Sequence, residues 1–241
     1  MLGTRVWKSR DFARREGYVM RTIALVFAML SVSGPAVAQP WTEYVNTQDG
    51  FKVNFPGQPT VTETTWQSQL DYVLPARVYS ADRGREHYSV TVVDYSDLER
   101  QGIERAGNCP PGNAQCRANA GPILGPGYWK HDERGAIVYA TFKLLQRDAT
   151  LTNLTWEWQD LVEGHLIQLT NNADRSRTFA YVAMHENKLY IVEGTVPRGF
   201  AEPALFQQSL GWVDEDGNRI RYRVVYSNAY HGLGVYPVPP R

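Results

Sequence analysis

Alternation of apolar and polar residues runs through most of the chain and predicts β-strands. The first clear example, residues 51–55, follows Asp49-Gly50 and stops at Pro56-Gly57, so turn-forming residues bound it on both sides. Strands are expected at 51–55, 61–67, 72–80, 88–95, 154–158, 166–169, 177–184, 189–192 and 220–226. Pro75 favours an edge or a bend for the third strand. Residues 189–192 are apolar throughout, which favours a central strand.

Two stretches in the first two thirds of the chain have helical patterns instead. Ser96 with Glu99 three residues later fits a capping box and predicts a helix to about Glu104. Asp132 is placed to cap a second helix that ends near Arg147. Its core-facing side is expected to hold Ile137, Ala140, Thr141, Leu144 and Leu145.

A third helix is expected between Pro203, which suits a first helical turn, and Gly211, which can end a helix. These elements predict an α+β fold: an antiparallel sheet with a few packed helices, in a single domain over residues 39–226. Residues 105–130 are expected to form an insertion loop and residues 227–241 an extended tail, because neither segment has a period.

The N-terminal segment has the order of a secretory signal peptide. Arg21 precedes a short apolar run at 23–30, and Ala36-Val37-Ala38 offers a small-residue cleavage site before Gln39. We expect cleavage at Ala38/Gln39 and a periplasmic or secreted protein. Residues 1–38 are then the signal peptide, with 1–19 upstream of the true start if translation begins at Met20. An uncleaved membrane anchor is the alternative, but the run is shorter than the ~20 residues that a span needs.

Charge excludes one class of partner. The whole chain carries 25 basic and 25 acidic residues, and loss of residues 1–38 removes six basic and two acidic ones, which leaves a net charge of −4. A mildly acidic chain has no overall field that attracts nucleic acid. We therefore expect no nucleic-acid partner and no transmembrane span in the mature chain.

Cys109 and Cys116 flank a stretch rich in Pro, Gly and Asn. An exported chain meets an oxidising compartment, so a disulfide that closes this short loop is expected. Zinc would need two further ligands nearby. A nucleophilic cysteine would need a histidine partner while the other cysteine stayed unpaired. We favour the bridge over both alternatives.

The opening Gly-Phe-x-Val-x-Phe-Pro-Gly-x-Pro at 50–59 and the sequence Phe-Gln-Gln-Ser-Leu at 206–210 resemble the PsbP-like superfamily, over about 41–213. The resemblance implies an antiparallel sheet with helices on both faces, and an accessory or binding protein rather than an enzyme. It implies no catalytic residue. The cysteine loop and the arginine-rich segment 219–223 depart from the pattern.

Residues with catalytic or metal-binding chemistry are scattered. No nucleophile elbow, phosphate-binding loop or His-Glu-x-x-His is present. The five histidines, no two within four residues, are His87, His131, His165, His185 and His231. We expect no metal and no cofactor, with His131 and His185 as exposed turn residues and His87 and His165 at strand ends.

Two acidic stretches have a chemical and a structural interpretation. Asp94, Asp97 and Glu99 could serve acid–base catalysis, but helix capping explains them better. Residues 214–218 resemble part of a calcium loop. However, Gly217 comes two places early and Val225 stands where a bidentate Glu is needed, which favours a turn.

Arg219, Arg221 and Arg223 alternate along the predicted last strand, which would place them on one face about 7 Å apart. Such a stripe could bind a polyanion, a phospholipid headgroup or an acidic partner. The alternative is a solvated face with ion pairs to the acidic residues at 214–216.

Four aromatic residues in the meander, Trp156, Trp158, Tyr181 and Tyr190, could form a stacking platform for sugars. The strand pattern favours core positions for them. The sequence thus predicts an exported, non-catalytic envelope protein that binds an unidentified envelope protein or a ligand. The alternative is a hydrolase or isomerase whose site is assembled from distant residues.

Overall fold

The computed structural model describes residues 40–112 and 129–227. The predicted signal peptide, Cys116 and all but the first residue of the predicted tail lie outside them. Seven antiparallel strands form the main sheet, in the order β3-β4-β5-β9-β8-β7-β6. Their bounds are β3 Thr60–Gln67, β4 Val73–Arg83, β5 Glu86–Asp94, β6 Ala149–Gln159, β7 Val162–Asn171, β8 Arg177–His185 and β9 Lys188–Val196.

A smaller sheet has the order β1-β2-β10-β11. Its strands are β1 Trp41–Asn46, β2 Phe51–Pro56, β10 Gly211–Val213 and β11 Arg219–Ile220. The helices are α2 Leu98–Gly107, α4 Trp129–Leu145 and α5 Ala204–Gln207. The expected α+β class, a single domain built on antiparallel strands with a few helices, is confirmed.

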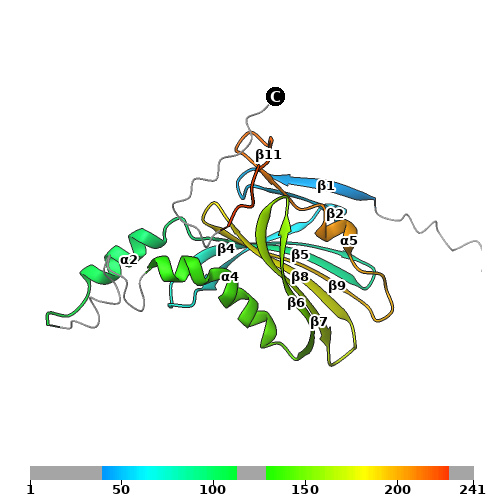
Figure 1. Cartoon of the computed structure of the whole chain (residues 1–241), viewed down its shortest axis with the longest axis horizontal. Helices are drawn as coiled ribbons and strands as arrows, with labels where there is room; N and C mark the ends of the chain where they lie inside the picture. Colours follow the sequence, from blue (N-terminus) through cyan, green and yellow to red (C-terminus); the bar gives the residue numbers. More distant parts are fainter. Residues whose placement is uncertain (1–39, 113–128, 228–241) are drawn as a thin grey trace, which may run out of the picture. The chain divides into compact units, whose positions relative to one another are not determined.

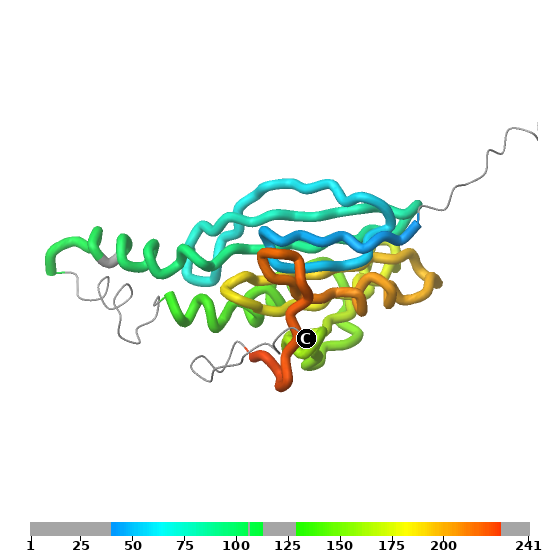
Figure 2. Tube along the Cα trace, turned by 90° about the horizontal axis from the view of Figure 1, so that it is seen from above, coloured from blue at the N-terminus to red at the C-terminus, as the bar shows by residue number. Residues whose placement is uncertain are grey.

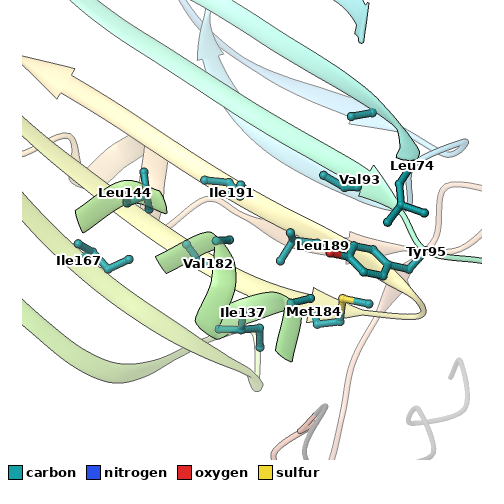
Figure 3. Packing of buried hydrophobic residues seen from close by; sticks show 14 of the residues in the cluster. Leu74, Val93, Tyr95, Ile137, Leu144, Ile167, Val182, Met184, Leu189 and Ile191 are labelled. Atoms are coloured by element: carbon teal, nitrogen blue, oxygen red, sulfur yellow. The ribbon is translucent and has the colours of Figure 1, made fainter. Parts of the chain in front are cut away.

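The main sheet separates two apolar clusters. Helix α4 covers one face, where Figure 3 shows its Ile137 and Leu144 packed toward Val182 and Ile191. The smaller sheet and α5 cover the other face. Helix α2 extends beyond the end of the sheet, as Figures 1 and 2 both show.

Strand β9 explains why a continuous apolar run belongs in the middle of this sheet. Leu189 and Ile191 face the α4 cluster, whereas Tyr190 and Val192 face the cluster beneath the smaller sheet. Side chains alternate between the faces of a strand, so a strand covered on both faces needs apolar residues at every position. The predicted central position is confirmed.

Both predicted helix caps are wrong in detail. The amide of Gln101 bonds to the carbonyl of Asp97, so Asp97 rather than Ser96 precedes α2. Helix α4 begins three residues before Asp132. Asp132 is fully buried and instead accepts hydrogen bonds from the hydroxyl of Ser68 and, at 3.2 Å, the amide of Gln69. It therefore caps the turn before β4, which fixes α4 against that strand.

The C-terminal part of the domain also differs from expectation. The third helix is a single turn, and Gly211 begins β10 instead of ending the helix. The expected last strand shortens to Arg219–Ile220, with one further isolated pairing between Tyr226 and Val162. Strands β1 and β10 have no counterpart among the predicted elements.

Pro75 lies in β4, which is flanked on both sides and is not an edge strand. However, the pairing of β4 with β5 begins only at Ala76, so Pro75 faces a partner, Thr65, on one side alone. A proline has no amide hydrogen, and this position is one that needs only one ladder neighbour.

Candidate functional site

Strand β6 presents large apolar side chains to solvent. Trp156 is 60% exposed and Trp158 54% exposed, and Leu154 is also exposed. On β7, Leu154 pairs with Ile167, Trp156 with His165 and Trp158 with Glu163. Ile167 belongs to the cluster under α4. All three therefore lie on the face of the sheet that carries α4, beyond the area that the helix covers.

This result overturns the expected core positions of the two tryptophans, although Tyr181 and Tyr190 are buried as expected. Strand β6 is the last strand of the sheet, so its side chains have neighbours on one side only. Local alternation cannot distinguish such an edge strand from an interior one. The expectation for Trp156 and Trp158 failed for that reason.

Helix α4 adds a second exposed apolar stripe, which sequence reasoning missed. Val138, Phe142 and Leu145 follow one another at the spacing of successive helical turns, and all three are exposed. Leu145 was expected to face the core. The opposite side of the helix packs on the sheet, where Ala136, Ala140 and Leu144 are buried. The exposed stripe therefore points away from the sheet.

His165 links the two stripes. Its Nδ1 lies 2.8 Å from the hydroxyl of Thr141, which is one residue before Phe142 on α4. The ring of Trp156 meets the His165 ring edge-on, with their centroids 4.6 Å apart. Burial lowers the pKa of His165, although Glu163 opposes that shift, so the imidazole is neutral at pH 7. A neutral ring suits this apolar setting.

We call the residues Val138, Phe142, Leu145, Leu154, Trp156 and Trp158 the α4–β6 surface. These six large apolar side chains are exposed on a helix and a strand that the contacts of His165 with Thr141 and Trp156 connect. Several exposed apolar residues in one region mark an interaction surface more than single scattered ones do. No ionisable side chain is among them. The chemistry that this surface offers is burial of apolar and aromatic area against a partner.

The predicted arginine stripe lies on the smaller sheet and the segment after it. Arg219, Arg221 and Arg223 are all exposed, and Tyr222 between them is buried. Arg219 forms a two-pronged contact with Asp160, both distances 2.9 Å, rather than with the acidic residues at 214–216. The turn at 214–218 is closed by the Asp214 carboxylate, which accepts from the Asn218 amide at 2.8 Å.

His185 was expected to be exposed, but it is 1% exposed and holds the C-terminal segment in place. Its Nε2 lies 2.6 Å from the hydroxyl of Tyr222, and its ring packs on Trp212 with centroids 4.4 Å apart. Burial, aided by the charge of Lys188, lowers the pKa of His185 to about 3. The role of this histidine is structural.

The carboxylates of Asp49 and Asp97 are both paired within the fold. Burial alone would raise the pKa of Asp49, but bonds from Arg77 and Tyr79 and the charges of Arg77 and Lys188 hold it below its ordinary value. Asp97 forms a surface ion pair with Arg100.

Among residues 40–112 and 129–227, no three His, Cys, Asp or Glu side chains gather as a metal site needs. No helix in these ranges is long and apolar enough to cross a bilayer.

No protein-family model matches the sequence, and no curated protein matches it. Among solved structures, the chain is similar to the solution structure of cyanobacterial PsbP (CyanoP) from Synechocystis sp. PCC 6803. The match covers 74% of this chain and 96% of that one, with 12% sequence identity and a TM-score of 0.39. The match is to a PsbP structure, and the motifs at 50–59 and 206–210 resemble the same superfamily.

Proposed function

We propose that this chain is an exported, non-catalytic envelope protein that binds a protein partner through the α4–β6 surface. The observation that carries the proposal is the exposure of Trp156 and Trp158 on β6, together with the exposed apolar stripe of α4. A buried aromatic residue covers 150–250 Å², so these two leave roughly 200 Å² in water. At about 25 cal/mol per Å², covering that area supplies about 5 kcal/mol of gross apolar burial, which offsets part of the cost of association.

Export is the second part of the proposal and rests on the predicted signal peptide. The mature protein is expected to begin at Gln39 and to carry the Cys109–Cys116 bridge. N-terminal sequencing and non-reducing mass spectrometry of protein from the periplasm or medium test both statements. Recovery of a cytoplasmic chain that still begins at Met1 or Met20 would contradict export.

Site-specific photo-crosslinking in the producing cell tests the binding surface. A photoreactive residue is placed in turn at Phe142 and at Trp156, with Val61 of β3 as an exposed apolar control. The proposal expects the same crosslinked product from both test positions and little or none from the control. Equal labelling at all three positions, or none above background, would contradict it.

Anion binding by Arg221 and Arg223 is a second candidate, favoured by their exposure on the segment that follows β11. Exchange of both for Gln is expected to leave the fold intact, because exposed charges contribute little to stability. It should also weaken binding to anionic vesicles, which added salt should weaken in the unmodified chain as well. Salt-independent binding, or none, would remove this candidate.

A further inference from the structure

The two edges of the main sheet differ in character. Half of the residues of strand β3 are threonines, Val61 is its exposed aliphatic residue, and its one tryptophan, Trp66, is partly buried. Strand β6 carries two exposed tryptophans and two exposed leucines, with Glu157 as its one charge and no proline. Within the described part of the chain, β6 pairs with β7 alone. Each edge has one charge and no proline, so the difference lies in the exposed apolar residues, and a long apolar edge favours pairing with another strand.

We propose that β6 pairs antiparallel with β6 of a second copy of this chain, about a two-fold axis at Trp156. This inference rests on the proposed function, because it identifies the partner of the α4–β6 surface. The pairing would join the two main sheets edge to edge. Such an interface is isologous, since the same residues contribute from both copies.

The regular part of β6 fixes the register. The pairing with β7 shifts between Leu151 and Asn153, and the hydroxyl of Thr152 bonds to the carbonyl of Gln168 at 3.0 Å. The unbroken ladder therefore runs from Asn153 to Gln159, and its midpoint is Trp156. A two-fold axis at the midpoint lets every residue of this ladder find a partner.

Side-chain chemistry supports the same register. With the axis at Trp156, Leu154 lies opposite Trp158 of the second copy and Trp156 lies opposite itself, so apolar residues meet on the α4 face. On the other face Thr155 meets Glu157. Moving the axis to Glu157 would place two glutamates directly opposite each other, which is unfavourable. An axis between Trp156 and Glu157 would place each tryptophan opposite the glutamate of the second copy, an apolar side chain against a charged one.

The expected dimer is reversible. A seven-residue ladder with its flanking apolar side chains is smaller than the ~800 Å² per partner of a standard stable interface. We therefore expect a monomer–dimer equilibrium that depends on protein concentration. The exposed stripes of both α4 helices would lie on the same face, on either side of the junction.

Sedimentation velocity of the mature chain over a range of concentrations tests the inference. The unmodified chain and the V61K control are expected to dimerise alike. The W156K and W156E chains, which place like charges across the axis, should each dimerise at least tenfold more weakly. Mixed in equal amounts, these two variants should associate more tightly than either alone, because Lys then faces Glu at position 156.

Several outcomes would overturn the inference. They are a monomer at every concentration, a dimer that V61K disrupts while W156K does not, and a mixture of W156K and W156E no tighter than its components. The inference would also fall if the full chain stayed monomeric while a chain lacking residues 228–241 dimerised. That result would mean that residues 228–241, not a second copy, occupy the edge of β6. If the chain is monomeric but both photoreactive positions capture one other protein, the proposed function stands and the dimer falls.

Discussion

Replacing Asp49 with Asn should destabilise the fold without changing the α4–β6 surface. Asp49 is 1% exposed in the turn between β1 and β2. Its carboxylate accepts a bond from Arg77 Nε at 2.7 Å and from the Tyr79 hydroxyl at 2.5 Å, and both donors lie on β4. The Tyr190 hydroxyl bonds to its backbone carbonyl at 2.5 Å. The residue thus fastens the smaller sheet to the main one.

The expected cost follows from these contacts. Removing one member of a buried ion pair costs 3–5 kcal/mol. The Arg77 side chain is 21% exposed, so water can partly replace the lost partner, and we expect about 3 kcal/mol for D49N. Y79F removes one hydrogen bond to a charged group and should cost about 1.5–3 kcal/mol. The Lys188 ammonium lies 3.9 Å from the Asp49 carboxylate, so K188Q should cost under about 1 kcal/mol.

Urea denaturation at pH 7 measures all three variants, with the slope of the unfolding free energy checked for constancy. The pKa of Asp49 is lowered in the folded state, so its stabilisation is present above its ordinary pKa of 3.8 and is lost as the pH falls below that value. D49N should therefore lose stability less steeply below pH 4 than the unmodified chain. A D49N cost under 1 kcal/mol at unchanged slope would refute the claim that this contact fastens the two sheets.

Three further predictions concern stability. Because the pKa of His185 is about 3 in the folded chain against 6.5 when free, only the unfolded chain gains its proton between these values. Stability should fall on acidification below pH 6.5, by up to about 1.4 kcal/mol per pH unit, and H185Q should flatten that fall in urea titrations at pH 7.5 and 5.0. W156S and W158S should each lower the unfolding free energy by at most about 2 kcal/mol, since both rings are more than half exposed; a loss of 3–5 kcal/mol, as for a core tryptophan, would contradict that exposure. Joint replacement of Cys109 and Cys116 by Ser should cost at most about 2–3 kcal/mol and leave the fold intact, as thermal unfolding can show, whereas two free thiols in periplasmic material would contradict the bridge.

Strand positions could be predicted from the sequence because they depend on local alternation. Residues 88–95 and 189–192 read as strands, and the structure places them side by side as β5 and β9. The short strands β1 and β10 escaped prediction, since β10 has only three residues and depends on pairing with distant β2. Tertiary contacts, which a local pattern does not contain, decide such elements.

The candidate site was harder to predict for the same reason. Trp156 has the alternation of a core residue, and only the order of strands in the sheet shows that nothing described covers it. His185 shows the converse error: it precedes the turn at 186–187, yet Trp212 and Tyr222 come from far along the chain to bury it. Exposure at a strand end or an edge depends on residues that are distant in sequence.

Amide hydrogen exchange along β6 tests most directly whether the α4–β6 surface is covered in the assembled protein. Mature chain is compared at high concentration and after dilution, with β3, the other edge strand, as the internal reference. The account predicts that amides between Asn153 and Gln159 exchange slowly at high concentration and faster on dilution, while those of β3 do not change. Fast exchange in β6 at both concentrations, equal to that of β3, would contradict it.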